Sequence, residues 1–383
     1  MRVRSTSLLG FCMTVALFGA AQAATFTKLH DFNGTDGVNP LIGLIDPTGN
    51  VYGGTSGGPM AVFRWSADGH FTDFGNLGGQ FTAGMSRDTD GNVYATDWGG
   101  GFYKISTEGA LSQVATLNAG VSLGFCNDPA GNFYATNFSQ KNVVAVSPGG
   151  SVVSSYPLPN TPQNSGVTCD AAGNLYGVTG WVDYGARSTV YQVSTSGVAT
   201  TLYTFCKKAD PSVTLCRNGA GLTGSPVRDI DGNLYGTAEF GGRDGGCLTS
   251  DALKASRGVY VGCGTIYELT ASRELKVLHR FCAHVDPVTK FCRDGAYPIT
   301  GIVIGPDGTL YSTTMFGGKF DGGTVWSLRP DGTYKVLHNF CAKANCTDGY
   351  FAVSLLMDGS GTLYGTTAEG GKHGDGTLFK IVP

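Results

Sequence analysis

Aromatic and acidic residues recur at one repeated position of the sequence, where they could bind a ligand together. Trp98, Phe138, Trp181, Phe240 and Phe316 each follow a repeated tyrosine by four or five positions. Glu239 and Glu369 stand at the same level, with Asp97 and Asp183 nearby. Flat aromatic faces suit sugar rings or apolar planar ligands, and two converging carboxylates could perform acid–base catalysis. The alternative is that these aromatic side chains only pack between neighbouring structural units.

Two pairs of aspartates resemble the start of a calcium-binding loop. They stand in Asp88-Thr89-Asp90-Gly91 and in Asp229-Ile230-Asp231-Gly232. A full loop of this kind needs a third oxygen ligand before its glycine and a glutamate at its end. Here the glycine comes one ligand too early, so we predict tight turns that hold no metal.

Histidines could supply a general base or a metal ligand. His30, His279 and His338 share one repeat position, in KLHDF, VLHRF and VLHNF, which favours a packing role. His284 and His373 have no evident partner in the sequence. The chain has no Gly-x-Ser-x-Gly elbow at a strand-to-helix turn and no zinc-protease helix, because no helical pattern is present in the sequence. We therefore predict no catalytic residue, no metal ligand and no cofactor.

The cysteines are predicted to form disulfides. The chain has 11 cysteines, and all of them except Cys12 follow the N-terminal apolar run, which leaves an even number. Zinc binding is the competing interpretation, but CxxC spacing is absent and no histidine pair accompanies the cysteines. The close pairs are Cys206/Cys216, Cys282/Cys292 and Cys341/Cys346, while Cys247 and Cys263 flank a longer loop and Cys126 and Cys169 stand in two successive repeats.

A repeated turn and strand must position all these residues. The segment DIDGNLYG, at residues 229–236, is one of seven related copies in which a tight turn precedes a short aromatic strand. The first copies recur about every 40 residues, the length of a four-stranded propeller blade, and the later spacings add insertions. The pattern predicts an all-β fold, a seven-bladed β-propeller of four-stranded blades over residues 24–383. The motif tyrosines are Tyr52, Tyr94, Tyr134, Tyr176, Tyr235, Tyr311 and Tyr364.

The two ends of the chain are expected to complete one blade. We name the strands of a blade A to D from the inside outwards, and the first blade then has strands at 41–45, 51–55, 61–65 and 70–74. Residues 25–32, TFTKLHDF, resemble strand D of other repeats, whereas the chain stops after a strand C. We therefore expect the N-terminal strand, 25–32, to pair with the last blade as its outer strand. Such closure protects strand edges that an open array would expose.

Every insertion falls between strands B and C or between strand D and the next strand A. These connections share one face of a propeller, and the A–B and C–D turns share the other. The D–A loops after Phe205, Phe281 and Phe340 each carry a cysteine pair, and the longest B–C loop spans 239–264. Long loops on a rigid scaffold often carry function, so we expect the aromatic positions near the channel mouth on this B–C/D–A face. The alternative is that the loops are insertions that the fold tolerates and that have no function.

The N-terminus has the pattern of a signal peptide. Arg2 and Arg4 precede an apolar run at 8–18, and Ala21-Gln22-Ala23 fits a cleavage site. The run is too short to cross a membrane, and Cys12 lies within it, unlike a lipid-attachment cysteine. We expect residues 1–23 to be removed and the protein to be secreted or periplasmic, monomeric, and without a membrane span or anchor. A net charge of −3 without long charged runs argues against nucleic acid as the partner.

The repeats resemble two groups of known proteins. The segments CRDGAYPITGIVIGPDGTLYSTTMFGGKFDGGTVWSLRPDG and GTLYGTTAEGGKHGDGTLFKIV are similar to the bacterial tandem-repeat family called GloVer, most strongly from Leu202 onward. That resemblance implies an exported repeat protein and no particular activity. The earlier repeats, such as NFYATNFSQKNVVAVSPGGSVVSSYPLP, also resemble streptogramin-lyase and NHL-type propellers. The lyase site uses a His/Glu set with a metal, and no positions here match it, so the resemblance implies the fold only.

Together these features favour a non-catalytic binding module for an extracellular or envelope ligand, either a glycan or a protein, held by the B–C/D–A face. The alternative is a propeller-type enzyme, a lyase or lactonase, with a metal-assisted site on the same face. A third interpretation is a purely structural component of the envelope or matrix.

Overall fold

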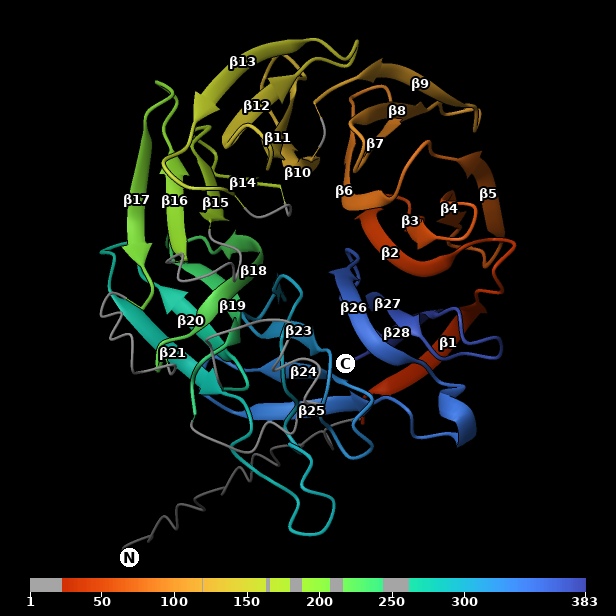
Figure 1. The fold of residues 1–383 in the computed structure, drawn as a ribbon, viewed down its shortest axis with the longest axis vertical. Helices are drawn as coiled ribbons and strands as arrows, with labels where there is room; N and C mark the ends of the chain where they lie inside the picture. Colours follow the sequence, from red (N-terminus) through yellow and green to blue (C-terminus); the bar gives the residue numbers. More distant parts are fainter. Residues whose placement is uncertain (1–22, 119, 163–165, 180–187, 207–215, 244–261) are drawn as a thin grey trace, which may run out of the picture.

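Short strands and tight turns alternate along the chain and form seven antiparallel sheets of four strands around one axis (Figure 1). This computed structural model describes residues 23–118, 120–162, 166–179, 188–206, 216–243 and 262–383. The expected seven-bladed β-propeller is confirmed. Most of the expected signal peptide, with Cys12, lies outside the described residues, as do Trp181, Asp183 and Cys247. None of the described segments forms an apolar helix of the length that a bilayer crossing needs.

The strands keep the same order in every blade, from the channel outwards. The A strands are β2 (Val38–Ile45), β6 (Phe81–Arg87), β10 (Val121–Asn127), β14 (Thr168–Cys169), β18 (Ala220–Arg228), β22 (Val303–Ile304) and β26 (Tyr350–Met357). The B strands are β3 (Val51–Gly57), β7 (Val93–Asp97), β11 (Phe133–Asn137), β15 (Leu175–Thr179), β19 (Leu234–Phe240), β23 (Leu310–Thr314) and β27 (Leu363–Glu369). The C strands are β4 (Ala61–Trp65), β8 (Gly101–Ile105), β12 (Asn142–Val146), β16 (Thr189–Val193), β20 (Thr265–Leu269), β24 (Thr324–Leu328) and β28 (Thr377–Val382). The D strands are β5 (Phe71–Asn76), β9 (Leu111–Thr116), β13 (Val152–Pro157), β17 (Ala199–Thr204), β21 (Leu275–Arg280), β25 (Tyr334–Asn339) and, for blade 7, β1 (Thr25–Asp31). A single 3₁₀ turn among the described residues, η1 (Ala344–Cys346), lies between β25 and β26.

The repeated A–B turn is built around the side chain of its first aspartate. One carboxylate oxygen of Asp229 accepts the backbone N–H of Asn233 at 2.8 Å. The other oxygen accepts the side-chain amide of Asn233 at 2.8 Å and the hydroxyl of Tyr235 at 3.0 Å. The motif therefore closes the turn and ties it to strand B, and the predicted tight turns are confirmed. The same three contacts recur at Asp46, Asp88 and Asp170.

The glycine after the motif tyrosine leaves space for an aromatic ring from strand C of the same blade. A Cβ atom on Gly236 would lie 2.3 Å from the hydroxyl oxygen of Tyr267, and one on Gly365 would lie 2.4 Å from the ring of Phe379. Both rings are buried within clusters that join neighbouring blades. Full burial of a large apolar side chain contributes about 1.5–3 kcal/mol, so these clusters are a main force between adjacent sheets.

The N-terminal strand closes the ring as predicted. β1 pairs antiparallel with β28, from Thr25 opposite Val382 to Asp31 opposite Thr377, and is the outer strand of blade 7. The ring of Phe26 stacks on His338 of blade 6 with centroids 3.8 Å apart. The first strand of the described chain therefore joins the last blade by hydrogen bonds and the preceding blade by packing.

Histidines on the outer strands of blades 5, 6 and 7 link each of these blades to the next one. The Nε2 atom of His279 lies 3.0 Å from a carboxylate oxygen of Asp294, which belongs to the following D–A loop. The His279 ring also stacks on Tyr334 of blade 6, with centroids 4.1 Å apart. The predicted packing role of these histidines is confirmed, and the aspartate partner explains their position. Equivalent sets are His30, Asp36 and Phe71, and His338, Asp348 and Phe26, while Tyr203 and Asn218 replace the polar pair after blade 4.

Candidate functional site

The A strands surround a channel of about 1040 Å³ along the propeller axis. Gln80 and Trp98 line its end on the B–C/D–A face, and Ile230 and Pro306 line its end at the A–B turns. Between these ends the wall is largely aliphatic. It includes Leu41, Ile299, Val303, Val353 and Leu356.

The hydroxyl groups in the channel wall are mostly used to join neighbouring blades. Thr223 Oγ1 donates to the carbonyl of Pro298 at 3.0 Å, and Thr168 Oγ1 donates to that of Pro226 at 2.7 Å. Ser354 Oγ accepts the backbone N–H of Ile42 at 3.2 Å. Because these groups are already satisfied, the channel offers a ligand mainly apolar surface.

Trp98 is the predicted site residue that borders the channel with an open face. Its side chain is 42% exposed, and its backbone N–H donates to the carbonyl of Gln80 at 2.8 Å. The ring of Phe138 lies next to it, with centroids 6.1 Å apart. The neighbouring Asp97 is buried and accepts the backbone N–H of Gly101 and the hydroxyl of Tyr103, at 2.7 and 2.9 Å. Asp97 therefore holds the loop in shape, and the indole remains available to a ligand.

The other predicted aromatic residues form a separate packed group between blades 5, 6 and 7. Phe240 is buried, and its ring lies 5.7 Å from that of Tyr297. Phe316 contacts Tyr297 and Phe351, with centroids 5.9 and 4.7 Å apart. The structure thus brings Trp98 and Phe138 together and places Phe240 and Phe316 elsewhere. The contacts of Phe240 and Phe316 are those of packing between blades, which was the alternative interpretation of these positions.

A cluster of polar residues at the boundary of blades 6 and 7 was not identified from the sequence. Burial raises the pKa of the Asp321 carboxyl, and a hydrogen bond from the backbone of Gly317 only partly offsets this. Burial also raises the pKa of Tyr350, and the negative charges of Asp321 and Glu369 add to that effect. The predicted Glu369 is exposed here, while Glu239 is buried in blade 5. The two predicted glutamates therefore differ in access to solvent.

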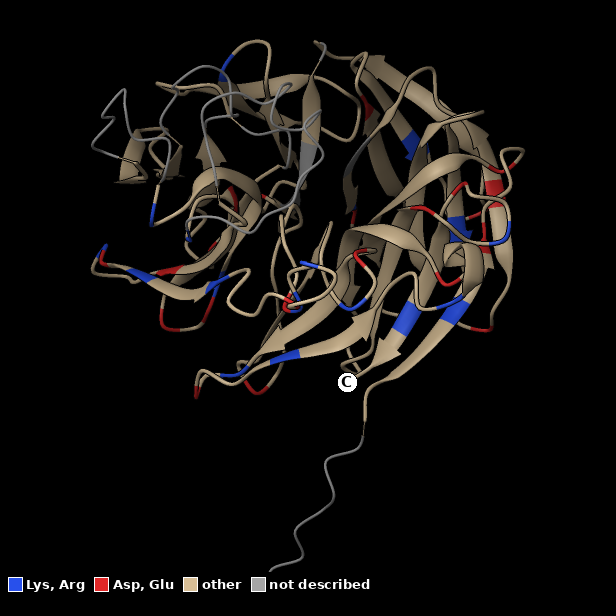
Figure 2. Ribbon diagram, turned by 60° about the horizontal axis from the view of Figure 1, so that its bottom comes forward, with Lys and Arg blue, Asp and Glu red and all other residues tan. Residues whose placement is uncertain are grey.

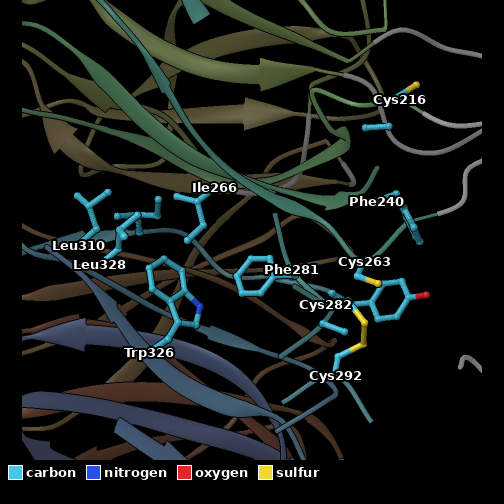
Figure 3. Packing of buried hydrophobic residues seen from close by; sticks show 14 residues of the cluster. Cys216, Phe240, Cys263, Ile266, Phe281, Cys282, Cys292, Leu310, Trp326 and Leu328 are labelled. Atoms are coloured by element: carbon cyan, nitrogen blue, oxygen red, sulfur yellow. A yellow bond between two sulfur atoms is a disulfide. The ribbon is translucent and has the colours of Figure 1, made fainter. Parts of the chain in front are cut away.

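Three of the predicted disulfides are present. They join Cys206 to Cys216, Cys282 to Cys292 and Cys341 to Cys346, each within one D–A loop. Cys263 is also disulfide-bonded, and its predicted partner Cys247 lies outside the described residues. Figure 3 shows the sulfur of Cys263 beside the Cys282–Cys292 bond, next to Phe281 and Phe240. Zinc binding by these bonded cysteines is thereby excluded, because zinc requires thiolates.

The remaining two cysteines differ from the prediction. Cys126 and Cys169 are thiols in this structure, one at the end of β10 and one in β14 of the next blade. The two thiols are hydrogen-bonded to each other. This hydrogen bond and burial both raise the pKa of Cys126. The same bond lowers the pKa of Cys169 despite its burial. The A strands of blades 3 and 4 therefore bring the two sulfur groups together without a covalent bond between them.

Two further properties limit what the described surface can bind. Within the described ranges, the one group that brings three possible metal-ligand atoms within 4.8 Å of one another is Cys263, Cys282 and Cys292, all disulfide-bonded. Acidic and basic residues are interspersed along the outer strands and loops, and Figure 2 shows no continuous basic stripe on the parts it colours. Such a stripe is typical of nucleic-acid binding.

The chain is similar to known proteins in two ways. Residues 252–383 match the family described as the Gloeobacter/Verrucomicrobia repeat. The fold is similar to a catalytically inactive virginiamycin B lyase from Staphylococcus aureus solved with quinupristin, at 17% identity and TM-score 0.62, covering 94% of this chain and 99% of that one. A streptogramin B lyase has 12% identity and TM-score 0.61, covering 94% and 97%. The extracellular domain of a hybrid two-component system from B. thetaiotaomicron has 10% identity and TM-score 0.58, covering 92% and 39%. At these identities the likeness shows the fold alone, and a search of the curated proteins found no sequence match.

Proposed function

We propose that this protein is an exported binding protein whose B–C/D–A face takes an extracellular glycan at the mouth of the channel. The open face of Trp98 at the edge of an aliphatic channel is the observation that supports this function. An indole ring presents a flat apolar surface and a polar N–H, which suits the apolar face and hydroxyl edge of a sugar ring.

The surroundings of Trp98 fit a sugar ring in two further respects. The exposed Gln80 side chain lies beside it and carries both donor and acceptor groups for hydroxyls. The channel volume of about 1040 Å³ is at the upper end for a ligand site, so the channel can receive a substituent of the bound sugar. The ring of Phe138 packs near the indole, with centroids 6.1 Å apart, and adds to the aromatic surface at this place.

The test is a glycan array followed by calorimetry of the best binder with wild-type protein and Trp98→Ala. We expect the substitution to weaken binding at least tenfold, about 1.4 kcal/mol. Phe320→Ala is the matched control, because Phe320 is also an exposed aromatic residue in a B–C loop but does not line the channel. If Trp98→Ala bound the glycan with the same affinity as wild type, the proposed site at Trp98 would be refuted.

Two other results would replace the proposal by a different function. A protein captured in pull-down experiments, with no glycan bound on the array, would identify a protein ligand. A stoichiometric divalent ion in the purified protein, together with turnover of a bound compound, would favour the propeller-type lyase or lactonase.

A further inference from the structure

A second pocket on the B–C/D–A face is lined by three arginines. It measures about 530 Å³ and lies beside blade 5, between Arg217, Arg243 and Arg280, with Gly242 and Cys282 also in its wall. No carboxylate is among its described lining residues. Like charges gathered in one pocket raise the local positive potential, although the whole chain carries a net charge of −3.

Backbone contacts orient two of these guanidinium groups. Arg280 Nε donates to the carbonyl of Arg217 at 3.4 Å, and Arg243 Nη1 donates to that of Ala283 at 3.3 Å. A guanidinium carries five donors in a fixed plane, so one such contact leaves other N–H groups for a ligand. The disulfides Cys206–Cys216 and Cys282–Cys292 fix the chain beside Arg217 and Arg280.

The repeats provide two copies of this corner in which a side chain at the end of the outer strand caps the B–C loop. In blade 7, Asp31 ends the outer strand, and its Oδ1 accepts the backbone N–H of Lys372 at 2.9 Å. In blade 6, Asn339 ends the outer strand, and its Oδ1 accepts the backbone N–H of Lys319 at 2.8 Å. Each lysine follows a Gly-Gly pair of the B–C loop, so one side-chain oxygen caps this loop in both blades.

The loop of blade 5 has the same geometry. Arg243 follows Gly241-Gly242, and the backbone N–H of Gly242 donates to the carbonyl of Cys216 at 3.0 Å. The equivalent bonds are Gly318 to Cys292 at 2.8 Å and Gly371 to Cys346 at 3.0 Å. The φ of 87° at Gly242 lies in the left-handed region, as do the 79° and 80° of its two counterparts.

Arg280 occupies in blade 5 the position of Asp31 and Asn339. A guanidinium has donors but no acceptor, so Arg280 cannot cap the N–H of Arg243. Within the described part of the chain, no side-chain oxygen accepts the backbone N–H of Arg243, whereas one does so at the equivalent position in the other two blades. In blade 7 the carboxylate of Asp31 has a pKa below its ordinary value, since hydrogen bonds from Lys28 and from the backbone of Lys372 outweigh the effect of burial. The backbone N–H of Lys372, which provides part of this effect, corresponds to that of Arg243 in blade 5.

We propose that this corner of blade 5 binds an oxyanion group of an extracellular ligand: a carboxylate, sulfate or phosphate. One ligand oxygen takes the place that the Asp31 carboxylate has in blade 7 and accepts the backbone N–H of Arg243. The guanidinium groups of Arg243 and Arg280 bind the remaining oxygens, for which their planar donor pairs are suited, and Arg217 adds positive charge to the same pocket. The site is separate from the Trp98 site and does not depend on it.

The test titrates the full oxidised chain with sulfate, pyrophosphate and trigalacturonate at low salt, using calorimetry. We expect saturable binding of at least one of the three, and the tightest probe identifies the oxyanion class. Arg280→Asp should weaken it at least tenfold, because this substitution supplies the intramolecular cap seen at Asp31. Arg329→Asp is the matched control, with the same change of charge at an exposed position in a C–D turn, and it should bind as wild type does.

Hydrogen exchange of the Arg243 amide provides a second measurement. It should slow on addition of the bound anion to wild type, and it should be slow in Arg280→Asp without any anion. An unchanged melting temperature in Arg280→Asp shows that the fold is kept. The proposal is overturned if none of the three anions binds at millimolar concentration, or if Arg280→Asp binds them as wild type does.

Discussion

Removal of Asp294 tests whether the histidine–aspartate pairs hold neighbouring blades together. Its side chain is 5% exposed and lies 3.0 Å from Nε2 of His279. It also accepts the backbone N–H groups of Ala283 and His284, at 3.1 and 3.4 Å. The backbone carbonyl of the same residue accepts the hydroxyl of Tyr334 in the next blade at 2.6 Å. Asp294→Ala therefore breaks three contacts at the junction of blades 5 and 6.

The expected cost follows from the burial of the pair. A net hydrogen bond to a charged group contributes about 1.5–3 kcal/mol, and a buried donor left without its acceptor costs about 1–3 kcal/mol. His279 retains 14% exposure, so water can partly replace its lost partner, and the three lost contacts together reach the upper end of these ranges and not their sum. We expect a loss of about 3 kcal/mol in the free energy of unfolding. With an m-value of about 3 kcal/mol/M, the urea midpoint falls by about 1 M.

The assay is urea unfolding of the oxidised protein at neutral pH. Asp90→Ala is the control, because Asp90 is exposed in an A–B turn and should have little effect. The double variant His279→Tyr/Asp294→Asn copies the natural Tyr203–Asn218 pair and should recover most of the lost stability. A shift below about 0.2 M for Asp294→Ala, which is the range of ordinary surface substitutions at this m-value, would refute the reasoning. So would a double variant that unfolds earlier than the single one.

Two further predictions concern acid stability and the free thiols. Burial raises the pKa of the turn aspartates Asp46, Asp88, Asp170 and Asp229, but their hydrogen bonds outweigh it and the pKa values lie below the ordinary one. Their contribution is therefore full above the unfolded pKa of about 3.9 and is lost as pH falls through the folded values. Thermal melts should be flat from neutral pH to about 5 and fall steeply below about 4, and Asp229→Asn should reduce that slope; an equal slope would contradict the assignment. Oxidised glutathione should convert Cys126 and Cys169 into one disulfide between blades, with two reduced glutathione molecules released. Non-reducing mass spectrometry should find the linked peptides, whereas a stable glutathione adduct on each cysteine would contradict their proximity.

Much of the fold could be predicted because each blade is specified locally. The residues of one turn contact each other within a few positions of the sequence. The local sequence motif is therefore enough to predict the structure of the turn. Ring closure followed from the ends of the repeat, since a spare outer strand must pair with the blade that lacks one. The disulfides within D–A loops were predictable for the same reason, because both cysteines of each pair lie in one short loop.

The candidate sites depend on how different blades meet, and the sequence does not give that. The five aromatic positions look equivalent in the repeat, yet Trp98 borders the channel and Phe240 is buried, because loops from the next blade cover one and not the other. The thiols of Cys126 and Cys169 meet across a blade boundary. Alignment of the repeats shows Arg280 in the place of Asp31 and Asn339. Only the structure shows that those two residues cap the Gly-Gly loops, and this observation is the basis of the oxyanion site proposed for blade 5.

The sequence by itself determined the number of blades, the position of the closing strand and the face that carries the insertions, because these follow from short-range turn chemistry and from counting strands. The tertiary structure alone decided which side chains face the channel, which pairs join blades and where positive charge gathers. Those properties arise from contacts between residues far apart in the chain. Their geometry is set by how sheets pack around the axis rather than by any local pattern.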